Sequence, residues 1–243
     1  MPDAITPQVD GWLFVICVGL AGALIGGLLL APWASRNRIG GTDEEDDTSG
    51  TGLRVVASPH SMPTWYRPVA TLAGLLAFGA LAWAYGPSWL LPGLLAFAAA
   101  GIAMSLVDLE EQRLPNRMLL PSMAAVATLL VLAATVNGTW WSLLGALAGG
   151  AAMFALYFLV AIVAPGGMGF GDVKLAAMIG LVLGCLGWVF WAAGLVIAFF
   201  IGGVIAVVAI LLRMVTLRGH VPFGPSMVAG AVIAASLPLL AEI

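Results

Sequence analysis

Charged side chains are scarce in this chain. Only 9% of its 243 residues are Asp, Glu, Lys or Arg, whereas 62% are hydrophobic and the mean hydropathy is +1.08. A soluble globular domain carries about a quarter charged residues. This scarcity excludes an ordinary soluble globule and indicates a protein that is solvated by a lipid bilayer. The net charge is only −3, so no nucleic-acid partner is expected.

Cysteine is also scarce. Cys17 and Cys185 both lie within apolar runs, where we expect them to be small core hydrophobes and not a disulfide or a metal site. The first ten residues contain two Asp and no Lys or Arg. A cleaved signal peptide begins with a positively charged region, so the first apolar run is expected to remain as a membrane span.

The chain contains many long apolar runs. A helix needs about 20 such residues to cross a hydrocarbon core of about 30 Å. The sequence therefore predicts an all-α, polytopic bundle of about eight transmembrane helices, near residues 11–33, 68–86, 88–107, 118–136, 142–163, 173–186, 188–212 and 224–241. The stretch 173–212 is about twice as long as one crossing requires at about 1.5 Å per residue. It must fold back, and Gly184 and Gly187 are the expected turn.

The basic residues predict an orientation. With eight spans, all nine Lys and Arg fall on one side of the membrane, in the segments 34–67, 108–117, 164–174 and 213–223. Basic residues collect on the cytoplasmic side, so both termini are predicted to be extracytoplasmic. Tryptophan gathers at the opposite ends of the spans, as an interfacial aromatic belt does. Its members are Trp12, Trp83, Trp89, Trp140, Trp141, Trp188 and Trp191.

The chain divides into three parts on this reading. An N-terminal transmembrane helix occupies 1–33, a polar cytoplasmic loop 34–67, and a membrane domain 68–243. The loop is rich in Gly and Ser and carries an acidic run from Asp43 to Asp47. Such a segment is predicted to be disordered.

Two carboxylates stand out near membrane depth, where ionisable groups are costly and indicate function. Asp108 ends the third span in SLVDLEEQRLPNRM, and Asp172 opens the sixth in GGMGFGDVKL. Each lies at the cytoplasmic end of a helical hairpin, so both are expected at the same depth. The pair is therefore a candidate aspartyl dyad, which needs no metal.

Two close carboxyls cannot both ionise easily, so one stays protonated while the other acts as a base toward water. Asp172 is predicted at a helix N-terminus near Lys174, which favours its ionised form. Asp108 is predicted at a helix C-terminus, which favours its protonated form. We therefore expect the shared proton on Asp108.

Glycines surround Asp172, at positions 166, 167, 169 and 171. They remove side chains where a substrate backbone would approach, and they permit positive φ. Taken alone, G-x-G-D is a short pattern, and a Gly-rich turn between two membrane helices is its common alternative explanation.

Three motifs in order resemble the type IV prepilin peptidases, a family of intramembrane aspartyl proteases. GFGDVKL at 169–175, with Gly169, Gly171 and Lys174, resembles their G-x-G-D-x-K-L signature. VDLEEQRLPNRM at 107–118 resembles their Asp motif with its Leu-Pro-Asp/Asn turn, here Leu114, Pro115 and Asn116. VPFGPSMVAG at 221–230 is similar to the opening of their last helix.

The resemblance implies a membrane endopeptidase in the bacterial inner membrane, with Asp108 and Asp172 as its catalytic pair at the cytoplasmic face. Such enzymes cut the short basic leader from prepilins or pseudopilins, after a Gly and before the apolar helix. Many members also methylate the new N-terminus with S-adenosylmethionine, an activity associated with a long loop bearing Cys-x-x-Cys pairs. The 34–67 segment has no cysteine, so we expect proteolysis without zinc, methylation or S-adenosylmethionine.

Several supporting residues keep more than one interpretation. Lys174 could meet a substrate acid, tune Asp172, bind a lipid phosphate or simply anchor the interface. Pro115 and Asn116 are expected to start and cap the fourth span. An alternative function is a small transporter or channel in which the two aspartates relay an ion or proton. Transporter sites usually lie near the bilayer midplane within inverted repeats, and no such repeat is evident.

Overall fold

The described residues of this computed structural model are 9–30, 65–111, 114–163, 169–212 and 222–237. The polar segment at 34–64, and Gly166 and Gly167 near the Asp172 motif, lie outside them. The division into an N-terminal helix, a loop and a membrane domain therefore stays a prediction.

Every regular element in the described residues is helical, which confirms the predicted all-α polytopic class. The order is α1 (Val9–Leu24), continued by the π-helical turn η1 (Ile25–Leu30), then α3 (Tyr66–Tyr85), α4 (Leu91–Glu111), α5 (Asn116–Asn137), α6 (Trp140–Val163), α7 (Phe170–Leu186), α8 (Trp188–Leu211) and α9 (Gly224–Ala235). Six stretches are long and apolar enough to cross a membrane. The protein is thus a multi-pass membrane protein.

The two remaining helices are shorter. α7 has 17 residues and α9 has 12, and both belong to segments that the sequence predicts as spans. The expected eighth span reached residue 241, but α9 ends at Ala235, and residues 238–243 lie outside the described part of the chain.

The turn between α7 and α8 lies at Gly187. Its φ is 132°, a backbone conformation that residues with a Cβ rarely adopt, so the expectation for Gly187 is confirmed. The expectation for Gly184 is wrong, because Gly184 lies inside α7 and is buried against α6. A Cβ on Gly184 would overlap the carbonyl oxygen of Gly145.

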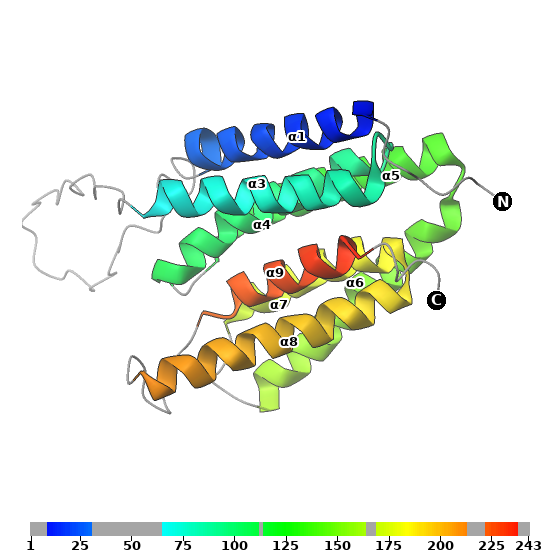
Figure 1. The fold of residues 1–243 in the computed structure, drawn as a ribbon. Helices are drawn as coiled ribbons and strands as arrows, with labels where there is room; N and C mark the ends of the chain where they lie inside the picture. The colour runs from blue at the N-terminus through cyan, green and yellow to red at the C-terminus, as the bar shows by residue number, and fades with distance from the viewer. Residues whose placement is uncertain (1–8, 31–64, 112–113, 164–168, 213–221, 238–243) are drawn as a thin grey trace, which may run out of the picture.

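Successive helices run up and down, and the bundle is joined by three extensive pairings: α6 with α7, α1 with α3, and α8 with α9 (Figure 1). The α6–α7 pair is packed backbone to backbone, with Gly145 and Gly149 of α6 against Gly180 and Gly184 of α7. Small residues at helix–helix contacts permit such close approach within membranes. α7 is thereby fixed in the interior, and most of its residues are buried.

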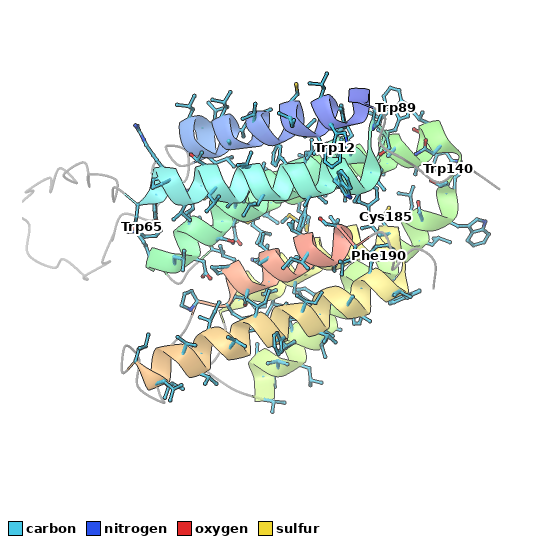
Figure 2. The ribbon with its side chains drawn as sticks, viewed as in Figure 1. Trp12, Trp65, Trp89, Trp140, Cys185 and Phe190 are labelled. Atoms are coloured by element: carbon cyan, nitrogen blue, oxygen red, sulfur yellow. The ribbon has the colours of Figure 1, made fainter. Side chains whose placement is uncertain are left out.

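The two ends of the bundle differ in chemistry. The described basic residues Arg67, Arg117 and Lys174 lie at the starts of α3, α5 and α7, which share one end. Trp12, Trp89 and Trp140 lie at the other end, and Trp65 is at the basic end (Figure 2). The indole rings of Trp12 and Trp83 are in contact, with centroids 4.6 Å apart. The predicted separation of basic residues from the tryptophan belt therefore holds for these residues.

The two cysteines are not equivalent. Cys17 is exposed on α1, so its expected place in the core is wrong. It faces the surface that an embedded protein presents to lipid. Cys185 is half-buried on α7 beside the aromatic ring of Phe190 in a cavity of about 310 Å³ (Figure 2).

Candidate functional site

Asp108 lies in the last turn of α4 and is only 3% exposed. Its Oδ2 accepts a hydrogen bond of 2.9 Å from the backbone N–H of Gly224, the first residue of α9. A Cβ on Gly224 would come within 2.7 Å of that oxygen. Glycine at this position therefore allows the start of α9 to reach a buried carboxyl on another helix.

Asp172 lies in the first turn of α7 and is 8% exposed. Its Oδ2 accepts a hydrogen bond of 3.3 Å from the N–H of Gly169, while its own N–H donates to the Gly169 carbonyl at 3.0 Å. The φ of Gly169 is −76°, so the expectation that this glycine permits positive φ is wrong. Gly169 instead occupies the N-cap position of α7 and helps to fix the Asp172 side chain.

The structure brings the two expected aspartates together at one end of the bundle. Asp108 is near enough for its charge to act on Asp172. α9 contacts both α4 and α7, so it connects the helices that carry them. Among the hydrogen bonds of the described residues, each carboxyl uses only Oδ2, which leaves both Oδ1 atoms available to a water or a substrate.

The Leu-Pro-Asn turn packs directly against the G-x-G-D motif. A Cβ on Gly171 would come within 2.7 Å of Leu114 Cβ, so the absent side chain of Gly171 makes room for the buried Leu114. Lys174 Nζ donates a 2.7 Å hydrogen bond to Asn116 Oδ1 and lies 4.9 Å from the ring centroid of Phe170. Lys174 therefore links the start of α7 to the start of α5.

The helix start expected at Pro115 and Asn116 is confirmed, but the capping role is wrong. Pro115 occupies the N-cap position without a side-chain hydrogen bond, and α5 begins at Asn116. The amide oxygen of Asn116 accepts from Lys174 instead of capping its own helix.

Two site residues were not singled out from the sequence. Gly224 lies inside the VPFGPS motif, whose match was the only signal for it. Tyr157 of α6 is 1% exposed, interacts electrostatically with Asp172, and packs its ring against Phe199 and Phe223. The sequence feature that could have identified Tyr157 is a phenol within an otherwise apolar span, because a buried tyrosine hydroxyl usually needs a polar neighbour.

A third helix end, the start of α9, lies beside the aspartates. Asp108 does lie at the C-terminal end of α4, but it also faces the N-terminal end of α9 through Gly224. Both aspartates therefore sit at a helix N-terminus, and the positive end of a helix dipole favours an anion at each. The helix ends do not distinguish the two, and the assignment of the proton to Asp108 stays a prediction.

These features define a class of protein: a multi-pass, all-α membrane protein with a buried pair of carboxyls at one end of its bundle. Residues 95–211, which carry both aspartates, match the type IV leader peptidase family. These residues therefore form a domain of that family.

Curated relatives are also named as leader peptidases. The chain is 32% identical over 171 residues to a prepilin leader peptidase/N-methyltransferase of Bacillus subtilis, covering 69% of this chain and 64% of that protein. It is 30% identical over 161 residues to the Stutzerimonas stutzeri protein of that name, covering 65% and 54%. A Neisseria gonorrhoeae protein of that name is 32% identical over 167 residues, covering 67% and 54%.

The chain thus spans between half and two thirds of the length of these relatives. No solved structure matches it significantly. The family match gives no support to the transporter or channel alternative.

Proposed function

We propose that this protein is an aspartic endopeptidase that removes the leader from prepilin or pseudopilin precursors, with Asp108 and Asp172 as its catalytic pair. The observation that carries the proposal is the pairing itself: two buried carboxyls from α4 and α7, each with one oxygen fixed by a backbone N–H. The family to which residues 95–211 belong supports the choice of substrate.

The chemistry follows from a pair that shares one proton. The ionised carboxylate takes a proton from a water, and the hydroxide equivalent attacks the scissile carbonyl carbon. The protonated carboxyl donates a hydrogen bond to the carbonyl oxygen, and the proton removed from water passes to the leaving amine as the C–N bond breaks. The fixed Oδ2 atoms of Asp108 and Asp172 keep both Oδ1 atoms facing the substrate throughout.

The expected depth of the site fits a substrate that is cut next to its membrane helix. Asp108 lies in the last turn of α4, which is long enough to span a membrane, and Asp172 lies in the first turn of the shorter α7, at the basic end of the bundle. Basic residues favour the cytoplasmic side. We therefore propose that the site opens at the cytoplasmic face of the bacterial inner membrane, where the leader of an unprocessed prepilin lies.

No metal or cofactor has a role in the proposed proteolysis, since the carboxyl pair supplies both acid and base. The relatives are named as N-methyltransferases as well as peptidases. The only long polar segment of this chain, 34–67, contains no cysteine. We therefore propose leader removal without transfer of a methyl group from S-adenosylmethionine.

The test is co-expression with a prepilin from the same genome, comparing the wild type with Asp108→Asn and Asp172→Asn. Removing a general acid or base typically slows a reaction about 10²–10⁴-fold, so both variants should leave the leader uncut. Glu110→Gln removes a partly buried carboxylate from the same end of α4 and should process within about threefold of the wild type, because Glu110 has no part in the proposed acid–base step. Processing that survives at either Asn variant, with the protein present in the membrane, would overturn the assignment of the pair.

A further inference from the structure

An apolar groove runs along the outside of the bundle between α3, α4 and α9, with a volume of about 550 Å³. α4 packs against both neighbours and forms the floor, while α3 and α9 form the walls (Figure 1). Ser105 and Ser236 are the only lining residues with a polar side chain. Several wall residues open outward, among them Leu76 at 62% and Ile233 at 43% exposure. The groove therefore opens toward the lipid.

One end of the groove lies close to Asp108. Pro225 lines it and directly follows Gly224, whose N–H holds Asp108. Ser105 lines it from the floor, one helical turn before Asp108. From Pro225 the groove follows α9 as far as Leu237, a length of about 18 Å at about 1.5 Å per residue.

The walls suit another helix. Ala73, Ala77 and Ala80 of α3 and Ala229 of α9 contribute side chains of a single carbon to the lining. Helices associate within membranes where small residues let their backbones approach closely. A lipid acyl chain could also fill an apolar groove, but acyl-chain binding would not explain why the groove ends close to Asp108.

Ser105 is the polar lining residue nearest to Asp108. Its hydroxyl is buried and has no hydrogen-bond partner within the described structure. Serine inside a membrane helix commonly bonds the carbonyl four residues earlier, as Ser122 does with Met118. A peptide must leave the helical conformation to be cut, which frees backbone groups that water cannot reach. Ser105 lies one helical turn before Asp108, and a rotation about its χ1 would turn the buried hydroxyl toward such a group.

We propose that this groove binds the apolar helix of the substrate, with the helix start at the aspartates and its axis parallel to α9. The proposal rests on the proposed function, since it takes a membrane-embedded precursor as the occupant. It has a geometric consequence. α9 and the substrate helix both run away from the site, so a step of four residues along α9 corresponds to about four residues along the substrate.

Disulfide cross-linking tests this register. Ala229→Cys and Ile233→Cys are made separately in a Cys17→Ala, Cys185→Ala background, with Asp172→Asn added to hold the uncut precursor. Single cysteines are then scanned along the apolar helix of the prepilin. Ala229→Cys should cross-link best to positions about four residues nearer the cut than those that Ile233→Cys selects. Val204→Cys, on the exposed surface of α8, is the matched control and should cross-link at no preferred position.

The outcomes separate the two proposals. The background without Asp172→Asn must process the prepilin, which tests the proposed function by itself. If it does, and the groove cysteines cross-link no better than Val204→Cys or without the shift in register, the groove is not the docking site and is a lipid-filled surface. Cross-links whose preferred prepilin position shifts by about four residues between Ala229→Cys and Ile233→Cys establish the groove as the docking site.

A bulky side chain gives a second, kinetic readout. Ala229→Trp narrows the groove away from the aspartates, so KM for the prepilin should rise about tenfold, the equivalent of about 1.4 kcal/mol of binding, with kcat little changed. Val204→Trp adds the same ring to α8 and should leave both constants unchanged. An unchanged KM for Ala229→Trp would contradict the proposal even if no cross-link could be formed.

Discussion

At the scale of single residues, the carboxyl pair depends on two glycines that donate backbone hydrogen bonds. Gly169 is the N-cap residue of α7, the helix that carries Asp172, whereas Gly224 comes from a different helix and lies 116 positions away from Asp108. A backbone donor fixes a carboxylate oxygen without adding a side chain that would compete for space. The two carboxyls are therefore held by backbone N–H groups. A substitution at either glycine would disturb this arrangement through the Cβ atom that it adds.

Gly224→Ala tests this dependence. The new Cβ would lie 2.7 Å from Asp108 Oδ2 and 3.1 Å from its Cγ, so either α9 or the carboxyl must shift. We expect prepilin processing to fall at least tenfold, because general acid–base catalysis typically contributes about 10²–10⁴-fold and depends on geometry. Gly203→Ala on α8, where a Cβ meets nothing within 4 Å, is the control and should retain full activity. Normal processing by Gly224→Ala would show that the Gly224–Asp108 bond is dispensable.

Lys174 is expected to position the Asp172 helix through Asn116 and not through contact with substrate. Lys174→Met keeps the length of the stem but removes the donor of the 2.7 Å bond. We expect it to lower thermal stability in detergent by about 1 kcal/mol, the usual net value of a hydrogen bond, with kcat reduced and KM unchanged.

A double-mutant cycle separates this role from the others open to Lys174. If the bond to Asn116 is what matters, Asn116→Leu combined with Lys174→Met should cost no more than either change alone. If Lys174 meets a substrate acid or a lipid phosphate, the two effects should add. Additive losses would therefore refute the positioning role.

At the scale of helices, α7 owes its place to a glycine contact with α6. Gly149 and Gly180 lie so close that a Cβ on Gly149 would come within 2.6 Å of the Gly180 carbonyl oxygen. The indole N–H of Trp191 adds a 3.0 Å hydrogen bond to the Gly149 carbonyl. Asp172 lies on α7, so this contact helps to set the depth and rotation of its carboxyl.

Substitutions at Gly149 should destabilise the protein in order of size. Gly149→Ala is expected to cost about 1–3 kcal/mol, the usual range for overpacking, and Gly149→Leu should abolish the folded protein. Thermal unfolding in detergent and the yield of monodisperse protein measure both. Gly203→Leu, which meets open space, is the matched control. Equal melting temperatures for Gly149→Leu and Gly203→Leu would mean that the α6–α7 contact is not tight.

Helices could be predicted from the sequence more readily than contacts between them. Hydropathy is a local property that reports burial in lipid along about 20 residues. The spans and the Gly187 turn could therefore be predicted from the sequence. Inter-helix contacts depend on rotation about each axis, which hydropathy does not encode. Gly184 illustrates this, since its sequence context suggested a turn while its actual role is contact with Gly145.

Some residues of the candidate site could be predicted from the sequence, and others could not. Asp108 and Asp172 stood out because carboxyls near membrane depth are rare and costly. Gly224 did not, because only the folded chain brings it to Asp108. The pairing of Lys174 with Asn116 was also hidden, since each had a sufficient local explanation as an interfacial anchor or a helix cap.

At the scale of the whole molecule, the distribution of charge is the feature that sets orientation. Arg67, Arg117 and Lys174 share one end with both aspartates, and the labelled tryptophans Trp12, Trp89 and Trp140 mark the other. The start of α1 and the end of α9 lie together at the tryptophan end (Figure 1). If basic residues face the cytoplasm, the aspartate pair faces it too, and the described ends of the chain face outward.

Cysteine labelling of intact cells tests that orientation on a single helix. In a Cys17→Ala, Cys185→Ala background, Arg117→Cys marks the first turn of α5 and Thr139→Cys lies just beyond its last residue; both positions are exposed. A charged maleimide that cannot cross the inner membrane should label Thr139→Cys in cells with a permeabilised outer envelope and label Arg117→Cys only after lysis. The reverse pattern would place the aspartates on the outer side, away from the leader of an unprocessed prepilin, and would contradict leader removal at the cytoplasmic face. Retained prepilin processing by both variants shows that the labelled proteins are folded.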